Sequence, residues 1–268
     1  MLNMLLGSLF ALVILIPQIS YAHGSILAAD INPLPKYVFV GEIHGTKETP
    51  EFFLEVVSEY ARTGKHCIIG LEIPSSEEKA INDYLFADDS EVANKESIML
   101  SSMFWHVPAS TYDGRASKAM LDMIKGLRKL VIDEKRNRLI LIGFHSKSDK
   151  DAARYIKEVL SKQDDAYFIG LSGNIHARNK PLSHPLSQEP MPQFFPQSER
   201  LAINVVAGEG NAWNCSSLST CGVISLIPMD NFPTDCEDRC LRMTPQDRAF
   251  DAIFAIRKVT ASLQAIAK

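Results

Sequence analysis

Short apolar runs alternate with amphipathic segments along most of the chain. Each run is rich in Val, Ile, Leu and aromatic residues, which is typical of a strand buried on both faces. The stretches between several runs carry apolar residues three or four positions apart, the spacing of one helix face. Strands are expected at residues 37–40, 67–71, 139–142, 167–171, 201–206 and 223–227.

Helices are expected between these strands and after them. Because strands that are apolar throughout must be covered on both sides, the pattern predicts an α/β fold with a mainly parallel central sheet and helices on both faces. A Gly-, Asn- and Ser-rich segment joins the last two strands, which favours an antiparallel hairpin at the sheet edge. The proline-rich region 179–200 is typical of a lid or binding loop. Helical spacing occurs at residues 53–60, 81–85, 116–131, 152–160 and 249–263.

The first residues of the chain have the pattern of an export signal. Residues 1–22 carry no charge, and their apolar run ends at Pro17. Ser20 and Ala22 place small side chains at the −3 and −1 positions of a cleavage site before His23. We therefore expect a cleaved signal peptide; the alternative is an uncleaved anchor, for which the apolar run is short.

Composition is that of a globular protein. The 268 residues are 46% hydrophobic and 22% charged, which argues against disorder. A net charge of −4 provides no basic excess for a phosphate backbone, so nucleic acid is not an expected partner. No linker-like stretch divides the chain. We expect residues 23–268 to form a single α/β domain without stable membrane insertion after signal cleavage.

The cysteines are consistent with export. Cys215, Cys221, Cys236 and Cys240 crowd the C-terminal third, and two disulfides are expected. Three pairings are open, of which Cys215–Cys221 with Cys236–Cys240 is the most local. A four-thiolate zinc site is the alternative, but the paired C-x2-C spacing is missing. Cys67 lies in an apolar run and is expected to be an inert buried thiol.

Polar side chains capable of chemistry follow four of the expected strands. The carboxyl ends of parallel strands meet at one edge of a sheet, where ligands bind in open α/β folds. Repetition of acids and imidazoles at equivalent positions therefore predicts one shared site. The residues are Glu42, His44, Glu72, His145, Asn174 and His176.

Two kinds of hydrolytic chemistry fit these residues. In the first, His44 and His176 bind a divalent metal ion with Glu42 or Glu72, and the metal activates a water molecule. In the second, an imidazole oriented by a carboxylate removes the proton from water without a metal. Both lead to a hydrolase acting on a small-molecule or peptide substrate.

Two short motifs carry a resemblance to a known superfamily. Gly41-Glu42-Ile43-His44 and Gly173-Asn174-Ile175-His176 are both G-x-x-H, and Glu72 ends a strand between them. This set resembles the superfamily that joins TIKI/TraB-type metalloproteases, erythromycin esterase-like hydrolases and ChaN-like haem-binding uptake proteins. The likeness in element order covers about residues 36–230.

The resemblance implies three different uses of the same residues. By analogy with the TIKI proteases, His44, His176 and Glu72 are expected to bind Mn, Co or Zn. By analogy with the esterases, Glu42 joins them as a catalytic set. By analogy with ChaN-like proteins, the chain binds haem in iron uptake without catalysis. Aromatic residues for lining a haem cleft are present at Phe104, Trp105 and Tyr112.

Substrate contacts are expected beside the catalytic residues. Arg115 precedes the long helix 116–131, where its guanidinium and the helix N-terminus favour an anionic substrate group. The alternative is a surface turn in which Asp113 caps that helix. His145 and Asn174 are the other predicted substrate contacts. The sequence thus favours an exported hydrolase of peptidase or esterase type.

Overall fold

The computed structural model describes most of the chain beyond the N-terminal segment. The described residues are Leu27, 31–133, 139–145, 147–183, 188–217, 220–227, 232–245 and 248–266. The predicted signal peptide, residues 1–22, lies outside them.

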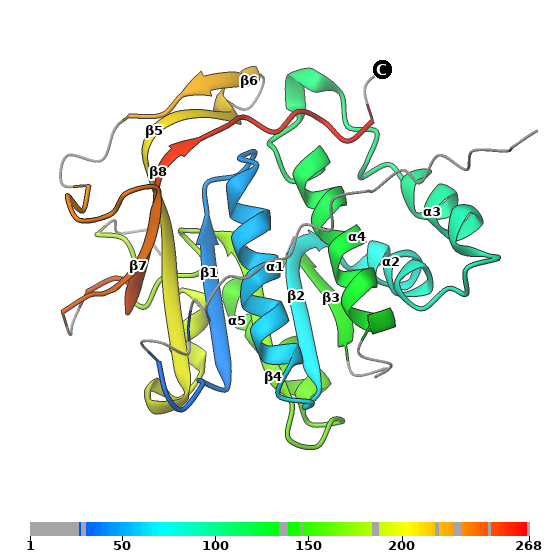
Figure 1. The fold of residues 1–268 in the computed structure, drawn as a ribbon, viewed down its shortest axis with the longest axis horizontal. Coiled ribbons are helices and arrows are strands. Elements are labelled where there is room, and N and C mark those ends of the chain that lie inside the picture. Colours follow the sequence, from blue (N-terminus) through cyan, green and yellow to red (C-terminus); the bar gives the residue numbers. More distant parts are fainter. Residues whose placement is uncertain are drawn as a thin grey trace, which may run out of the picture.

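The described strands form one eight-stranded sheet in the order β3-β2-β4-β1-β5-β8-β7, with β6 paired to β5 (Figure 1). All pairings are parallel except those of β6 with β5 and β7 with β8. The predicted fold class is therefore confirmed, including the antiparallel hairpin. The strands are β1 (Tyr37–Glu42), β2 (Cys67–Pro74), β3 (Leu139–His145), β4 (Tyr167–Gly173), β5 (Arg200–Ser217), β6 (Thr220–Ser225), β7 (Arg239–Met243) and β8 (Ala252–Val259).

Helices cover both faces of the sheet. Side chains of a strand alternate between faces, so Val38 and Val40 of β1 pack with α1 and α4, whereas Phe39 packs on the side of α5. Phe52 of α1 stacks on Phe254 of β8 with ring centroids 3.6 Å apart. The helices are α1 (Glu48–Ala61), α2 (Glu78–Leu85), α3 (Val92–Leu100), α4 (Lys118–Asp133) and α5 (Asp149–Leu160), and short 3-10 turns span Ser75–Glu77, Ala109–Thr111, Met191–Phe194 and Gln197–Glu199.

The predicted helix at residues 249–263 is wrong, because this segment contains strand β8. β8 pairs in parallel with β5 and antiparallel with β7. A short apolar run is compatible with a buried helix or a buried strand, and only the free strand edge of β5 decides between them. Helix α3 and strand β7 were not predicted, since α3 is only weakly amphipathic and the five residues of β7 have no period-2 alternation of polar and apolar side chains.

The described part of the proline-rich region packs onto the face that carries α5. Met191 and Phe195 are buried there. The Arg200 guanidinium donates to the carbonyl groups of Pro192 and Phe195, both at 2.7 Å. From residue 188 onward this region is therefore packed against the α5 side of the sheet.

The cysteines pair as the most local alternative predicted. Disulfides join Cys215 to Cys221 and Cys236 to Cys240. Cys67 is free and buried, and burial raises the pKa of its thiol to about 12, which makes it unreactive near neutral pH. Among the described helices, none is long and apolar enough to cross a bilayer.

Candidate active site

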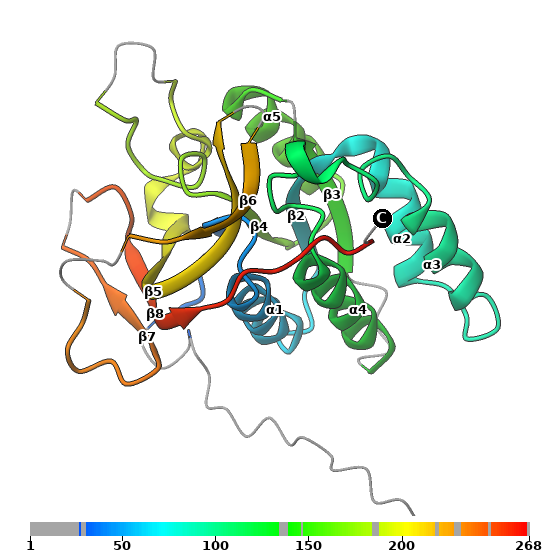
Figure 2. The same ribbon diagram turned by 90° about the horizontal axis from the view of Figure 1, so that it is seen from above.

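The carboxyl ends of three adjacent strands bring the predicted residues to one edge of the sheet. β4 lies between β1 and β2, and Glu42 is in register with Gly173. The backbone N–H of Asn174 donates to the carbonyl of Glu42 at 3.2 Å. Figure 2 looks down on this edge, with the β5–β6 hairpin beside it. The loops that follow β1 and β4 therefore start side by side.

Glu42 and His44 form a hydrogen-bonded pair. The Nδ1 atom of His44 lies 2.9 Å from Oε1 of Glu42, whose side chain is only 4% exposed. Burial lowers the pKa of His44, but the carboxylates of Glu42 and Glu72 outweigh burial and the opposing charge of Arg115, so its pKa is raised. Because Nδ1 is occupied by Glu42, the Nε2 atom is left to act on a substrate or water.

Glu72 faces the other nitrogen of His44. Its Oε2 atom lies 3.8 Å from Nε2 of His44 and accepts the backbone N–H of Gly173 at 2.7 Å. Its Oε1 atom accepts from Nη1 of Arg115 at 3.0 Å. Burial raises the pKa of Glu72, yet the rings of His145 and His44, the Gly173 N–H and Arg115 together lower it to about 2. Glu72 is therefore a fixed negative charge and a weak base.

Both glycines that open the G-x-x-H motifs lie close to groups of the site. A Cβ atom on Gly173 would lie 3.1 Å from Nε2 of His44 and 3.5 Å from Oε2 of Glu72. A Cβ atom on Gly41 would lie 3.0 Å from the Cα atom of Asn174. A side chain at position 41 would press on the backbone at Asn174, and one at position 173 would press on the ring of His44, so each neighbour would have to shift by a few tenths of an ångström.

Arg115 is fixed by its neighbours. Its Nε atom donates to Oδ2 of Asp113 at 2.9 Å, Nη2 contacts the same oxygen, and Nη1 contacts Glu72 and His145. The interpretation of Asp113 as a helix cap is wrong, because Oγ of Ser117 accepts the N–H of Met120 at 3.1 Å instead. Arg115 lies at the site as predicted, but it serves first as the partner of Glu72; its contact with substrate stays a prediction.

His145 lies on the other side of Arg115. Its Nδ1 atom contacts Nη1 of Arg115 and lies 3.8 Å from Oε1 of Glu72. A guanidinium only donates, so Nδ1 accepts and the ring proton is on Nε2. The side chain is 34% exposed, which leaves this N–H accessible at the edge of the site. The structure thus places His145 beside Glu72, as the strand-end position predicted.

His176 has a partner that sequence reasoning missed. Its Nδ1 atom lies 2.9 Å from Oδ1 of Asp149, the first residue of α5. This hydrogen bond raises the pKa of His176; Glu72 adds to the rise, while burial and His44 oppose it. Acidic residues are common in the first turn of a helix, where they interact favourably with the helix dipole. The presence of Asp149 there therefore gave no indication in the sequence that it pairs with His176.

The donors at the site do not fit a resident metal ion. Within the part of the chain that the structure describes, no three His, Cys, Asp or Glu side chains are grouped as metal ligands. Both oxygens of Glu72 already accept N–H groups, and the Arg115 guanidinium at 3.0 Å supplies the positive charge. A metal cation bound to the same carboxylate would be repelled by the positive charge of Arg115 at short range.

The aromatic residues proposed for a haem cleft belong to the core. Trp105 and Tyr112 are 0% and 1% exposed, and Phe104 packs edge-on against Trp105. Their rings therefore cannot face a cofactor without unpacking the main core. Haem binding stays a prediction without support from these three residues.

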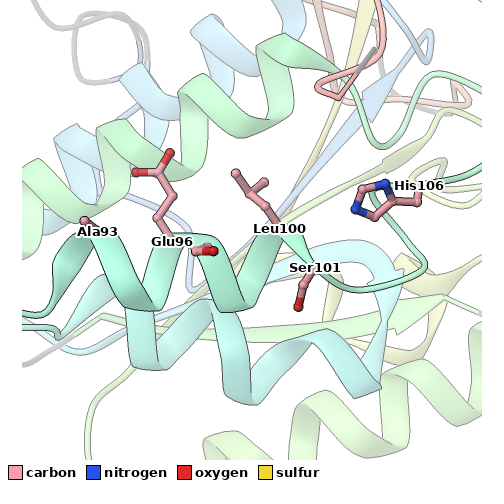
Figure 3. A pocket seen from close by; sticks show the side chains of 6 residues that line it. Ala93, Glu96, Leu100, Ser101 and His106 are labelled. Atoms are coloured by element: carbon pink, nitrogen blue, oxygen red, sulfur yellow. The ribbon is translucent and has the colours of Figure 1, made fainter. Parts of the chain in front are cut away.

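A separate pocket of about 570 Å³ lies along α3 and the turn that follows (Figure 3). It contains none of the residues of the Glu/His site. Its lining is Ala93, Glu96, Ser97, Leu100, Ser101 and His106.

The chain is similar to several proteins of known structure in its fold, at low sequence identity. No family model matches the sequence, and no curated protein does so either. An erythromycin esterase, EreC, solved as a histidine-to-asparagine mutant in its open conformation, superposes with a TM-score of 0.54 at 12% identity over 87% of this chain and 93% of that one. A protein from Bacillus cereus gives a TM-score of 0.58 at 12% identity, covering 87% of this chain and 90% of that chain.

A third solved structure, a succinoglycan biosynthesis protein, gives a TM-score of 0.55 at 12% identity, covering 85% of this chain and 89% of that chain. The chain therefore shares its fold with an erythromycin esterase, as the element order implied. At this identity the likeness concerns the fold alone, and the correspondence of the two G-x-x-H motifs stays a prediction.

Proposed function

We propose that the protein is an exported, metal-independent hydrolase that cleaves an ester or peptide bond with His44 as general base. The observation that carries the proposal is the arrangement of His44 between two carboxylates: Nδ1 is 2.9 Å from Glu42, and Nε2 faces Glu72 at 3.8 Å. An imidazole fixed in this way is suited to remove a proton from water.

The proposed reaction begins at Nε2 of His44. This atom takes a proton from a water molecule, and the water oxygen attacks the carbonyl carbon of the substrate. Glu42 stabilises the imidazolium that forms, because its carboxylate accepts the N–H on Nδ1. In this scheme the Nε2–H group of His145, whose side chain is 34% exposed beside Glu72, donates to the carbonyl oxygen as that oxygen gains negative charge.

Glu72 has an electrostatic role in this scheme. With a pKa lowered to about 2, it does not accept a proton near neutral pH. Its negative charge instead raises the pKa of His44 and makes the ring a stronger base. Arg115 and the Gly173 N–H keep this charge in place.

Export and the chemical class of substrate rest on separate arguments. The two disulfides support an oxidising compartment. The fold shared with an erythromycin esterase supports hydrolysis as the reaction class, and a small-molecule ester or a peptide is the proposed substrate.

The proposal is tested by turnover of p-nitrophenyl esters and fluorogenic peptides by the purified protein. His44→Ala is expected to lower kcat/KM at least about 100-fold, because general base catalysis is lost. His106→Ala is the matched control, since this histidine lies in the α3 pocket outside the site. Equal activity of His44→Ala and the wild-type protein would show that His44 is not the base.

A further inference from the structure

Asp149 and His176 form a second carboxylate–imidazole pair that the proposed base does not use. Their Oδ1 and Nδ1 atoms are 2.9 Å apart. The side chain of Asp149 is 12% exposed and that of His176 is 43% exposed. The pair therefore has a largely covered acid and a ring that reaches solvent. The Glu42–His44 pair has the same kind of hydrogen bond, but the side chain of His44 is only 19% exposed.

The two pairs share one edge of the sheet. The N–H of His176 donates to the carbonyl of Gly173 at 2.9 Å, so the His176 loop turns back onto the end of β4. Gly173 is itself the residue whose Cβ position lies 3.1 Å from Nε2 of His44. The loop that carries His176 thus begins against the ring of His44. In both rings Nδ1 is held by a carboxylate, which leaves each Nε2 atom available.

Asp149 is not required as the cap of its helix. Oγ of Ser148 accepts the backbone N–H of Asp151 at 3.1 Å and occupies the cap position of α5. Asp151 also supplies an acid to the first helical turn. The direction of the Asp149 side chain, onto the imidazole of His176, therefore calls for a reason other than helix stability.

Hydrolysis needs a proton donor as well as a base. Once water has added to the carbonyl carbon, the bond to the leaving oxygen or nitrogen must break, and an alkoxide or amide anion is a poor leaving group unless it is protonated. His44 receives its proton from water on the side of Glu72. A second imidazole that is hydrogen-bonded to its own carboxylate can supply the proton to the leaving group.

We propose that Asp149 is a positioning residue that holds His176 as the general acid for the leaving group; this inference rests on the proposed hydrolase function. In this step the bond from the carbonyl carbon to the leaving atom breaks, its electron pair goes to that atom, and the proton on Nε2 of His176 is transferred to it. The carbonyl double bond re-forms. His44 then releases the proton taken from water to solvent and His176 takes one up, so one water is consumed per bond cleaved.

The test compares two leaving groups with one acyl group. The substrates are the p-nitrophenyl ester and the ethyl ester of butyric acid, with wild-type protein and Asp149→Asn. p-Nitrophenolate leaves without a proton, whereas ethoxide requires one. Asp149→Asn is therefore expected to lower kcat for the ethyl ester at least about tenfold and to change kcat for the p-nitrophenyl ester by less than about twofold.

Asp151→Asn is the matched control, because it removes a carboxylate from the same turn of α5 that bonds Ser148 and Arg154 and not His176. This variant should hydrolyse both esters at wild-type rates. If Asp149→Asn does not fold, as judged by circular dichroism, His176→Gln gives the same leaving-group comparison.

Two results would overturn the inference. Loss of activity by the same factor on both esters would show a merely structural role for Asp149, and unchanged activity on the ethyl ester would show no role in proton transfer; in both cases the proposed function stands. Absence of wild-type turnover on either ester and on peptides would overturn the proposed function and the role of Asp149 with it.

Discussion

At the residue scale, the site is a set of imidazoles whose properties are fixed by the groups on their Nδ1 atoms. Glu42 holds His44, Arg115 holds His145, and Asp149 holds His176. A carboxylate accepts the N–H of a ring and favours its charged form, whereas a guanidinium only donates. Three histidines at one edge can therefore serve different roles, which residue type alone does not reveal.

The Glu42–His44 pair predicts a change in pH dependence. His44 acts as a base when neutral, so kcat/KM should rise with pH through its raised pKa. Glu42→Gln removes one of the two carboxylates that raise this pKa, so the rise is expected at lower pH, with a plateau reduced about tenfold to 1000-fold because the ring loses its orientation. Profiles of kcat/KM against pH for the two proteins measure both effects; an unshifted rise would contradict the assignment of the base.

At the element scale, the β5–β6 hairpin supports the loop that carries Arg115. β5 continues past the sheet to Ser217, and Nε1 of Trp213 donates to the carbonyl of Tyr112 at 2.9 Å. The backbone N–H of Trp213 donates to the carbonyl of Gly45 at 3.0 Å. The hairpin thus contacts the segments on both sides of the site, next to His44 and next to Asp113.

The Cys215–Cys221 disulfide closes this hairpin, so its removal should reach the site. Replacing both cysteines by Ser is expected to reduce the free energy of unfolding by about 1 to 3 kcal/mol and to lower kcat, because Arg115 and Glu72 are held less firmly. The double replacement of Cys236 and Cys240 is the control: it should reduce stability and leave kcat within about twofold. Urea unfolding and ester turnover give the two readouts, and equal kcat losses in both variants would argue against support of the site by the hairpin.

At the scale of the whole molecule, the sheet order places β4 between β1 and β2 and so gathers residues from distant parts of the chain. Within the site, the Arg115 guanidinium lies against the carboxylates of Glu72 and Asp113. The carboxylate of Glu72 thus has a cation of the protein itself as its partner, which is the physical basis for proposing a reaction without a metal.

Removal of metal ions tests that proposal on the intact protein. Dialysis against EDTA followed by 1,10-phenanthroline is expected to leave ester turnover within about twofold of the untreated protein, because Glu72 is already paired with Arg115 and the Gly173 N–H. Elemental analysis of the same samples checks that Mn, Co and Zn are absent. Activity that disappears on chelation and returns with one of these ions would contradict the metal-independent reaction.

Much of the fold could be predicted because its strands are continuous apolar runs. Each predicted strand overlaps one of β1 to β6, although β5 extends to Ser217 and β6 begins at Thr220. The segment of β8 is predicted as a helix, because an apolar run of that length has no unique period. At the site, Glu42, His44 and Glu72 were found from their positions after strands. Asp149 was not, since its pairing with His176 depends on where α5 packs.

The sequence by itself therefore determined the alternation of elements, the fold class and the strand ends at which acids and histidines accumulate. These follow from patterns within a few residues. Only the tertiary structure decided which partner each imidazole has, that the guanidinium of Arg115 donates to the carboxylate of Glu72, and that residues 252–259 join the sheet as a strand. Each of these depends on contacts between segments far apart along the chain, and the packing that creates such contacts leaves no periodic signal in either segment.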